Sequence, residues 1–260
     1  MDLGLAGKAA IVTGGSAGIG RGVALRLAQE GARVAICARR AEPLEEAADA
    51  LREQTGGDVL PVAADVSKAD DVRRLIEAAV ERFGRLDILV NNAGTSSASP
   101  FADVDDGVWQ EDLDLKLFAA IRTIRLAVPH LARAGGGSIV NVVNIGAKAP
   151  PARSLPTTVS RAAGVALTKA LSKEFAAQQI RVNAVCIGLV KSDQWVRRAR
   201  ALGITLEEYY ERTARERAIP LGRVAEAEEV GDLIAFLCSE RGRYITGTAI
   251  NFDGGSSAVV

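Results

Sequence analysis

The chain has 260 residues, which is long enough to bury a sizeable hydrophobic core. Lys and Arg together number 32, and Asp and Glu together also number 32, so there is no basic excess of the kind that attracts nucleic acid or an anionic membrane. No stretch approaches the roughly 18 apolar residues of a membrane-spanning helix. The composition therefore predicts a soluble, cytoplasmic protein with no nucleic-acid partner and no membrane partner.

The three cysteines predict neither disulfides nor a metal centre. Cys37, Cys186 and Cys238 are far apart in the sequence and lie in apolar runs. This setting is typical of small buried side chains. We therefore expect a reducing compartment and no metal site.

Short apolar runs alternate with longer helix-like segments along the whole chain. Near-continuous apolar runs indicate strands that are buried on both faces, and alternation with helices indicates parallel pairing. Strands are predicted at residues 9–13, 33–38, 58–64, 86–94, 138–143, 181–187 and 248–255. Because no linker or repeat divides the chain, we expect one α/β domain over residues 1–260, a doubly wound parallel sheet of the Rossmann type.

The first predicted strand leads into a glycine-rich turn. The stretch "AAIVTGGSAGIGRGVALRLAQEGARVAICARR" reads as a strand, a turn that opens a helix, and a second strand. Gly14, Gly18 and Gly20 would let the backbone turn tightly and approach a pyrophosphate, whose charge the N-terminus of the following helix favours. Glycines alone could also form a plain helix entry. In this βαβ context they predict a dinucleotide site.

The second strand ends without the acidic residue that would hold the adenosine ribose of NAD. Ala38 occupies the expected acidic position. Arg39 and Arg40 follow it, and their guanidinium groups suit a 2′-phosphate. The strand end therefore predicts NADP(H), the alternative being that both arginines are solvated loop residues.

Residues 191–217 interrupt the alternation of strands and helices. Long excursions from compact domains are often lids, so we interpret this segment as a substrate lid, the alternative being a solvated amphipathic pair of helices. Tyr209 and Tyr210 lie in it. Either could supply a phenol to a substrate, although packing within the segment is the favoured interpretation.

Several motifs together resemble the short-chain dehydrogenase/reductase family over nearly the whole chain. They are "TGGSAGIG" at 13–20, "ADV" at 64–66, "NNAG" at 91–94 and the tail from 219 to 255. The resemblance implies a nicotinamide cofactor, a small-molecule substrate and a homodimer or homotetramer built through helices around 108–133 and 157–178. It also implies cofactor contacts at Ser16, Ile19, Asp65, Val66, Asn92, Ala93, Gly94, Arg161 and Gly188.

The family's usual active site contains asparagine, serine, tyrosine and lysine, and this sequence departs at all four positions. Matching the motifs puts Lys116 at the asparagine position, Asn144 at the serine position, and Thr157 and Arg161 at the tyrosine and lysine positions. The last two lie four residues apart and so share one face of a helix. No tyrosine of the chain is followed by a lysine four residues later. Ile187 is a further departure, because the family usually has proline there, beside the nicotinamide.

The altered residues leave few groups that can move a proton. A threonine hydroxyl is far less acidic than a phenol, and arginine stays charged at ordinary pH. Lys116, if it lies beside Arg161, could act as a base, an acid or an imine-forming amine, or it could be structural and point into solvent. Asn144 can still donate a hydrogen bond to a carbonyl oxygen.

Three functions stay open at this point. The cofactor motifs favour an NADP(H)-linked oxidoreductase with an altered proton relay, acting on a small carbonyl, alcohol or enone. The four replacements motivate two alternatives. One is a lyase or isomerase that uses Lys116, and the other is a catalytically silent nucleotide-binding protein.

Overall fold

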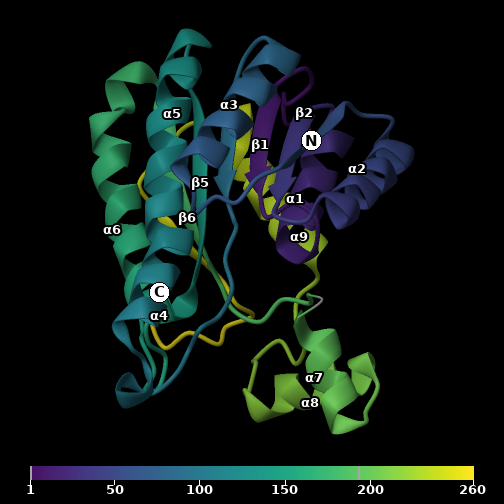
Figure 1. Ribbon diagram of the computed structural model, residues 1–260, viewed down its shortest axis with the longest axis vertical. Coiled ribbons are helices and arrows are strands. Elements are labelled where there is room, and N and C mark those ends of the chain that lie inside the picture. Colours follow the sequence, from purple (N-terminus) through teal and green to yellow (C-terminus); the bar gives the residue numbers. More distant parts are fainter. Residues whose placement is uncertain (1, 193) are drawn as a thin grey trace.

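The computed structural model describes residues 2–192 and 194–260, and its strands form one sheet of seven. Every neighbouring pair of strands is parallel. The strands are β1 (Ala9–Thr13), β2 (Arg33–Ala38), β3 (Val59–Ala63), β4 (Ile88–Asn91), β5 (Gly137–Asn144), β6 (Ile180–Ile187) and β7 (Ala249–Phe252). Their order is β3-β2-β1-β4-β5-β6-β7, which confirms the doubly wound α/β fold (Figure 1).

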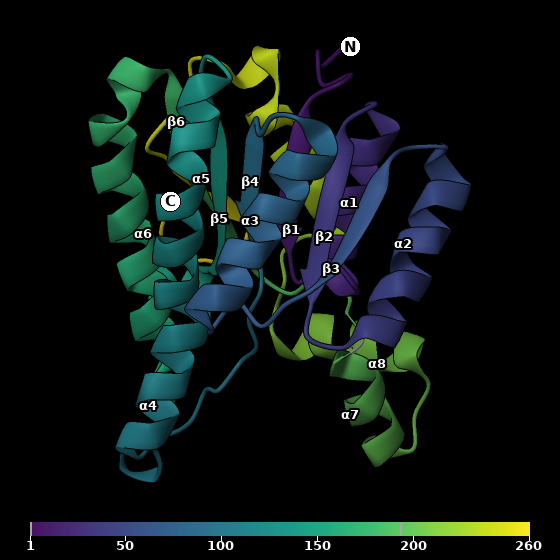
Figure 2. The ribbon, with the colours of Figure 1, turned by 45° about the horizontal axis from the view of Figure 1, so that its top comes forward.

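Helices cover both faces of this sheet (Figures 1 and 2). One face carries α1 (Gly18–Gln29), α2 (Ala41–Thr55) and α9 (Ala227–Cys238), and the other carries α3 (Ala69–Phe83), α5 (Ala119–Arg133) and α6 (Thr157–Glu174). Successive strand side chains point to opposite faces, so apolar strands supply both layers. Two large apolar clusters result, one on each face. The expected burial on both faces is confirmed for β1, β2, β4, β5 and β6, whereas the edge strands β3 and β7 are only partly buried.

The helices α1 and α9 approach closely because a glycine from each lies in their contact. A Cβ at Gly22 would come within 2.7 Å of the backbone of Ala227, and a Cβ at Gly231 within 2.7 Å of the Gly22 carbonyl oxygen. The buried residues of both helices join one apolar cluster, which includes Val23, Leu27, Val230 and Ile234. The helix that opens at the glycine-rich turn is thus packed against a helix from near the end of the chain.

The segment predicted as a lid forms two helices, α7 (Gln194–Leu202) and α8 (Leu206–Glu216), which stand apart from the two helical layers (Figure 2). Together with flanking residues such as Ile219 and Val224, it forms a small apolar core in which Tyr210 is buried and Tyr209 is partly buried. The rings of Trp195 and Tyr209 lie 5.8 Å apart. Both tyrosines therefore pack within the segment, and its role as a lid stays a prediction.

The cysteines are buried and free, as their apolar surroundings predict. Burial raises the pKa of the Cys37 thiol to about 12, so this group stays protonated at neutral pH. Among residues 2–192 and 194–260, no helix is both long enough and apolar enough to span a lipid bilayer.

Candidate functional site

The glycine-rich turn joins β1 to α1 at the carboxyl edge of the sheet. Gly14 and Gly18 have positive φ angles of 68° and 52°, which side chains other than glycine rarely adopt. A Cβ at Gly14 would come within 3.0 Å of the Ala93 Cα, and a Cβ at Gly20 would overlap the Gly14 carbonyl oxygen. The turn therefore presents bare backbone at the N-terminus of α1, where N–H groups favour an anion.

Polar contacts from the end of β4 hold this turn in place. The Thr13 hydroxyl accepts hydrogen bonds from the backbone N–H groups of Asn92 at 2.9 Å and Ala93 at 3.0 Å. The Asn92 amide donates in return to the carbonyl oxygen of Thr13 at 2.9 Å. Asn92 and Ala93, which are both predicted to contact the cofactor, therefore also contact the start of the glycine-rich turn, and the Asn92 side chain stabilises it.

The strand β2 ends at Ala38, and Arg39 and Arg40 follow it with exposed side chains. Within residues 2–192 and 194–260, no acidic side chain forms an ion pair with either arginine. Both guanidinium groups are therefore available to an anion. The structure confirms the strand end on which the phosphate prediction depends.

The other residues predicted at the cofactor border the same edge of the sheet. The Asp65 carboxylate accepts hydrogen bonds from the Ser67 N–H at 3.0 Å and the Ser67 hydroxyl at 2.7 Å. One of its oxygens is therefore already occupied within its own turn. The remaining predicted residues lie beside strand ends or at the start of α1, and they are Ser16, Ile19, Val66, Gly94 and Gly188.

Ser192 is a site residue that the sequence analysis missed. It follows β6, and its Cβ lies 3.2 Å from the point that a Cβ on Gly18 would occupy. Its hydroxyl oxygen is buried and has no hydrogen-bond partner. A buried polar atom without a partner calls for a missing one, and beside a bare-backbone turn a ligand oxygen fits. The only signal in the sequence is a hydroxyl side chain four residues after Gly188.

Arg161 lies one turn into α6, above the end of β5. Its Nη1 donates to the Val142 carbonyl oxygen at 2.9 Å, and a Cβ at Gly94 would overlap its Nη2. The guanidinium thus stands between β5 and the loop after β4. Burial lowers the pKa of Arg161 to about 10, and the negative charge of Asp112 opposes that change, so the side chain stays a cation at neutral pH.

The hydroxyl of Thr157 points into the protein. It accepts hydrogen bonds from the Ser97 backbone N–H and from Lys116 Nζ, both at 3.0 Å. The Thr157 hydroxyl itself donates to an Asp112 carboxylate oxygen that lies 3.5 Å away. The side chain is buried, so the family's tyrosine position is occupied here by a hydroxyl that is already engaged on all sides.

Lys116 forms an ion pair with Asp112, a residue that the sequence analysis did not single out. The pair joins Nζ to Oδ2, and each side chain is only 1 % exposed. The other oxygen of Asp112 accepts a hydrogen bond from the Ser160 hydroxyl at 2.6 Å. Burial lowers the pKa of Lys116, Asp112 opposes this, and the charge of Arg161 adds to it. The alternative in which Lys116 points into solvent is therefore wrong, because the fold buries its amine.

A π-helical turn over Asp114–Phe118 carries Lys116. It separates α4 (Asp106–Leu113) from α5 inside the long helix expected around 108–133. Such turns place an extra residue in a helix and occur frequently at functional sites.

Asn144 ends β5 and is half-buried. Its Oδ1 is buried and has no hydrogen-bond partner. Unlike Thr157 and Lys116, it therefore keeps an unused polar atom that a ligand could bind.

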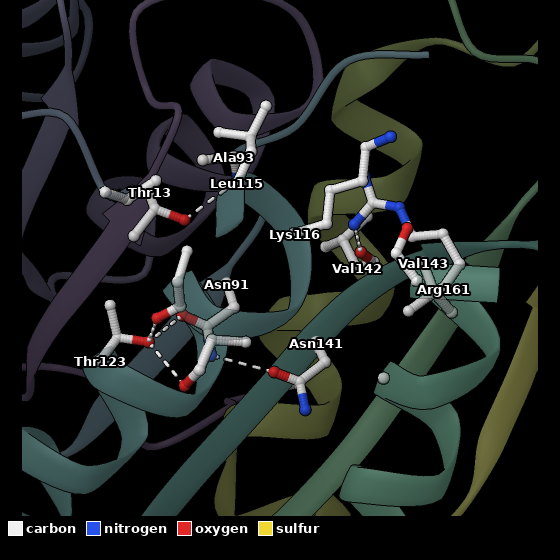
Figure 3. A pocket seen from close by; sticks show the side chains of 15 residues that line it. Thr13, Asn91, Ala93, Leu115, Lys116, Thr123, Asn141, Val142, Val143 and Arg161 are labelled. Carbon is white, nitrogen blue, oxygen red and sulfur yellow. Dashed lines mark hydrogen bonds between the residues drawn. The ribbon is translucent and has the colours of Figure 1, made fainter. Parts of the chain in front are cut away.

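A cavity of about 20 Å³, which is enough for about one water molecule, is lined by Lys116, Arg161 and Asn91 among others (Figure 3). Lys116 and Arg161 lie side by side at one side of it. On the other side the Asn91 amide donates to Asn141 at 2.9 Å and accepts from Thr123 at 2.7 Å. No group of three or more His, Cys, Asp or Glu side chains suited to a metal ion is found in the described parts of the chain.

Comparison with known proteins identifies the family. Residues 14–257 match the family described as enoyl-(acyl carrier protein) reductase. The putative ketoacyl reductase 2 of granaticin polyketide synthase, from Streptomyces violaceoruber, is 41 % identical over 251 residues, which is 95 % of each chain. The chain belongs to the short-chain dehydrogenase/reductase family.

Solved structures of similar proteins share the fold over nearly the whole chain. L-sorbose reductase from Gluconobacter frateurii, in complex with NADPH and L-sorbose, matches with a TM-score of 0.95 and 38 % identity over all of both chains. An NADPH-bound short-chain oxidoreductase from Pseudomonas aeruginosa PAO1, described as containing an atypical catalytic center, matches with a TM-score of 0.93 and 38 % identity over 98 % and 99 % of the two chains.

Within this short-chain dehydrogenase/reductase, Lys116, Thr157 and Arg161 come together, as the matched positions imply. Lys116 contacts Thr157 directly and lies beside Arg161. Asn144 shares no described hydrogen bond with them. Asp112 and Ser160 complete the cluster and were not predicted. A signal for both was present in the sequence, because Asp112 stands one helical turn before Lys116 and Ser160 stands next to Arg161.

Proposed function

We propose that this protein is an NADP(H)-linked oxidoreductase with an altered proton relay, acting on a small carbonyl, alcohol or enone. The observation that carries the proposal is the cradle of bare backbone around Gly14 and Gly18 with the unpartnered Ser192 hydroxyl beside it. Such a cradle fits a pyrophosphate. NADPH in the structures of two relatives supports the same cofactor here.

The cofactor would lie along the carboxyl edge of the sheet. Arg39 and Arg40 would hold the 2′-phosphate, and Arg161 would reach the nicotinamide ribose. When bound, NADPH would supply the hydride. The chain itself must then orient the substrate and provide a proton for its oxygen. Asn144 could bind the substrate here, because its unused Oδ1 can accept a hydrogen bond from a hydroxyl group and its Nδ2 group can donate one to a carbonyl oxygen.

Supplying a proton to the substrate oxygen is the difficult step for this site. The Thr157 hydroxyl is buried and accepts a hydrogen bond from the Ser97 backbone N–H, and Arg161 remains a cation. Lys116 is the remaining acid, and burial lowers its pKa toward a useful range, but its ammonium is already paired with Asp112. We therefore expect slow reduction of simple ketones. The same pairing disfavours a lyase or isomerase that needs Lys116 as a free amine.

The decisive experiment follows NADPH consumption with purified protein and a panel of ketoses, 3-oxoacyl thioesters and enones. Turnover that is lost in Asn144→Ala but not in the exposed-surface variant Arg82→Ala would support the oxidoreductase. Tight NADPH binding without any turnover would favour a silent nucleotide-binding protein. This second candidate is supported by the ion pair and hydrogen bonds that already engage the side chains of Asp112, Lys116, Thr157 and Ser160.

Replacement of both Arg39 and Arg40 by alanine is expected to weaken NADPH binding about tenfold or more and to leave NADH binding nearly unchanged. Hydrogen bonds to charged groups contribute about 1.5–3 kcal/mol, and only NADPH carries the 2′-phosphate. Calorimetric titration of both cofactors measures the effect. Arg82→Ala is the control, because Arg82 pairs with Asp58 at the opposite edge of the sheet. Equal losses for the two cofactors would contradict the phosphate assignment.

The protein is also proposed to form a homodimer or homotetramer. Phe118 beside α5 and Val159 of α6 are 40 % and 45 % exposed, so apolar side chains remain uncovered on the helices that the family uses for association. Val159→Glu is expected to shift the population toward smaller species in light scattering at micromolar concentration. Wild-type protein that scatters as a monomer at every concentration would reject the proposal.

A further inference from the structure

The Asp112 carboxylate connects three segments that border the proposed nicotinamide site. Through Oδ2 it holds Lys116 on the π-helical turn, and through Oδ1 it holds Ser160 on α6. Lys116 in turn donates to the Thr157 hydroxyl, which receives the Ser97 N–H from the loop after β4. One carboxylate thus links the π-helical turn to α6 directly and, through Lys116 and Thr157, to this loop.

The same carboxylate balances the charge of the site. Lys116 and Arg161 are two cations that lie side by side at the cavity. The charged groups that face Lys116 are Asp112 from α4 and Arg161 from α6. Asp112 is therefore the counter-ion on which both cations depend. Without it, the two buried positive charges would repel each other, so that Lys116 would lose its proton or one side chain would move.

We propose that Asp112 is the positioning residue of the nicotinamide half of the site. It does not touch the cofactor. It acts by balancing the charge of Lys116, so that Arg161 keeps its place between β5 and the loop after β4. The inference rests on the proposed function in one respect only, which is that the site binds NADPH.

The two halves of the proposed cofactor site lie far apart across the sheet, and this makes the inference testable. Arg39 and Arg40 follow β2, whereas Arg161 bonds to β5, and β1 and β4 lie between these strands. Adenosine 2′,5′-bisphosphate carries the adenosine half of NADPH and lacks the nicotinamide. It therefore reports on the fold and on the arginines without involving Asp112.

The test compares the affinities of NADPH and adenosine 2′,5′-bisphosphate in the Asp112→Asn variant by calorimetry. We expect NADPH to bind at least about fivefold more weakly, the lower end of typical coupling between sites, while the bisphosphate binds as in wild type. Asp114→Asn is the matched control, because it removes a neighbouring carboxylate that pairs with Arg122 instead. It is expected to leave both affinities unchanged.

A second variant separates charge from packing. Asp112→Asn combined with Lys116→Met removes the surplus cation together with the carboxylate, and is expected to bring NADPH affinity to within about fivefold of wild type. A packing role would leave the double variant no better than the single one. If Asp112→Asn does not fold, the NADPH affinity of the double variant decides, and a loss beyond fivefold overturns the inference.

Unchanged NADPH affinity in Asp112→Asn, or an equal loss for both probes in a folded protein, overturns the positioning role. Wild-type protein that binds neither probe contradicts the proposed function instead.

Discussion

A variant with five substitutions is expected to reduce simple ketones with NADPH about 10²- to 10⁴-fold faster than wild type. This is the usual contribution of general acid–base catalysis. It combines Thr157→Tyr, Arg161→Lys, Asn144→Ser, Lys116→Asn and Asp112→Asn. The first four changes restore the family's residues, including a phenol with a pKa of about 10 that a lysine can tune. The fifth is needed because Lys116→Asn alone would leave the Asp112 carboxylate buried without a cation.

Initial rates of NADPH consumption measure this gain, after circular dichroism and NADPH titration have shown that the variant is folded and binds cofactor. The four-change variant that keeps Asp112 is the matched control, and it is expected to be markedly less stable. The prediction fails if wild type already turns over simple ketones rapidly, or if the variant with five substitutions is slower than wild type. In that event Tyr209 and Tyr210 become the next residues to replace.

Lys116→Met alone is expected to lower the free energy of unfolding by about 3–5 kcal/mol, because breaking a buried pair leaves its partner charge uncompensated. Replacing both partners, as Asp112→Leu with Lys116→Met, is expected to restore stability close to that of wild type, since well-packed apolar side chains often replace a buried ion pair without loss. Urea denaturation at neutral pH and fixed protein concentration measures the three proteins.

Asp114→Asn is again the control. It breaks the pair with Arg122, whose side chains are 25 % and 30 % exposed, and partly exposed pairs of this kind contribute about 0–1 kcal/mol. A Lys116→Met variant that unfolds at the same urea concentration as Asp114→Asn would show that the Asp112–Lys116 pair contributes little.

The fold was predictable from the sequence because its signals are local and repeated. Apolar runs such as residues 9–13 and 138–143 mark strands that are buried on both faces, and β1 and β5 are observed there. The glycine-rich turn was predictable for a similar reason, since only bare backbone allows its close contact with Ala93. Arg39 and Arg40 could be placed because they directly follow a strand.

The interior of the site was less predictable, because its contacts join residues that are distant in the sequence. The matched positions placed Thr157 and Lys116 in the same site, but nothing in their spacing shows that they bond to each other. Asp112 is one of many carboxylates on exposed-looking helices, and its burial follows from the packing of α4 against α6. Ser192 stands in a segment without periodicity, so only the folded chain places its hydroxyl beside Gly18.

The close packing of α1 against α9 has a consequence for how the chain can be divided. The surface of α1 around Gly22 is covered by Ala227 and Gly231 of α9, which the chain supplies only after position 226, so a fragment that contains β1 to β5 alone would leave this surface in contact with water. We therefore expect that the nucleotide-binding half does not fold as an autonomous unit. A substitution as small as Gly231→Ala, made away from the glycine-rich turn, would push α9 away from Gly22 and tilt α1, whose first turn would face the pyrophosphate of the proposed cofactor.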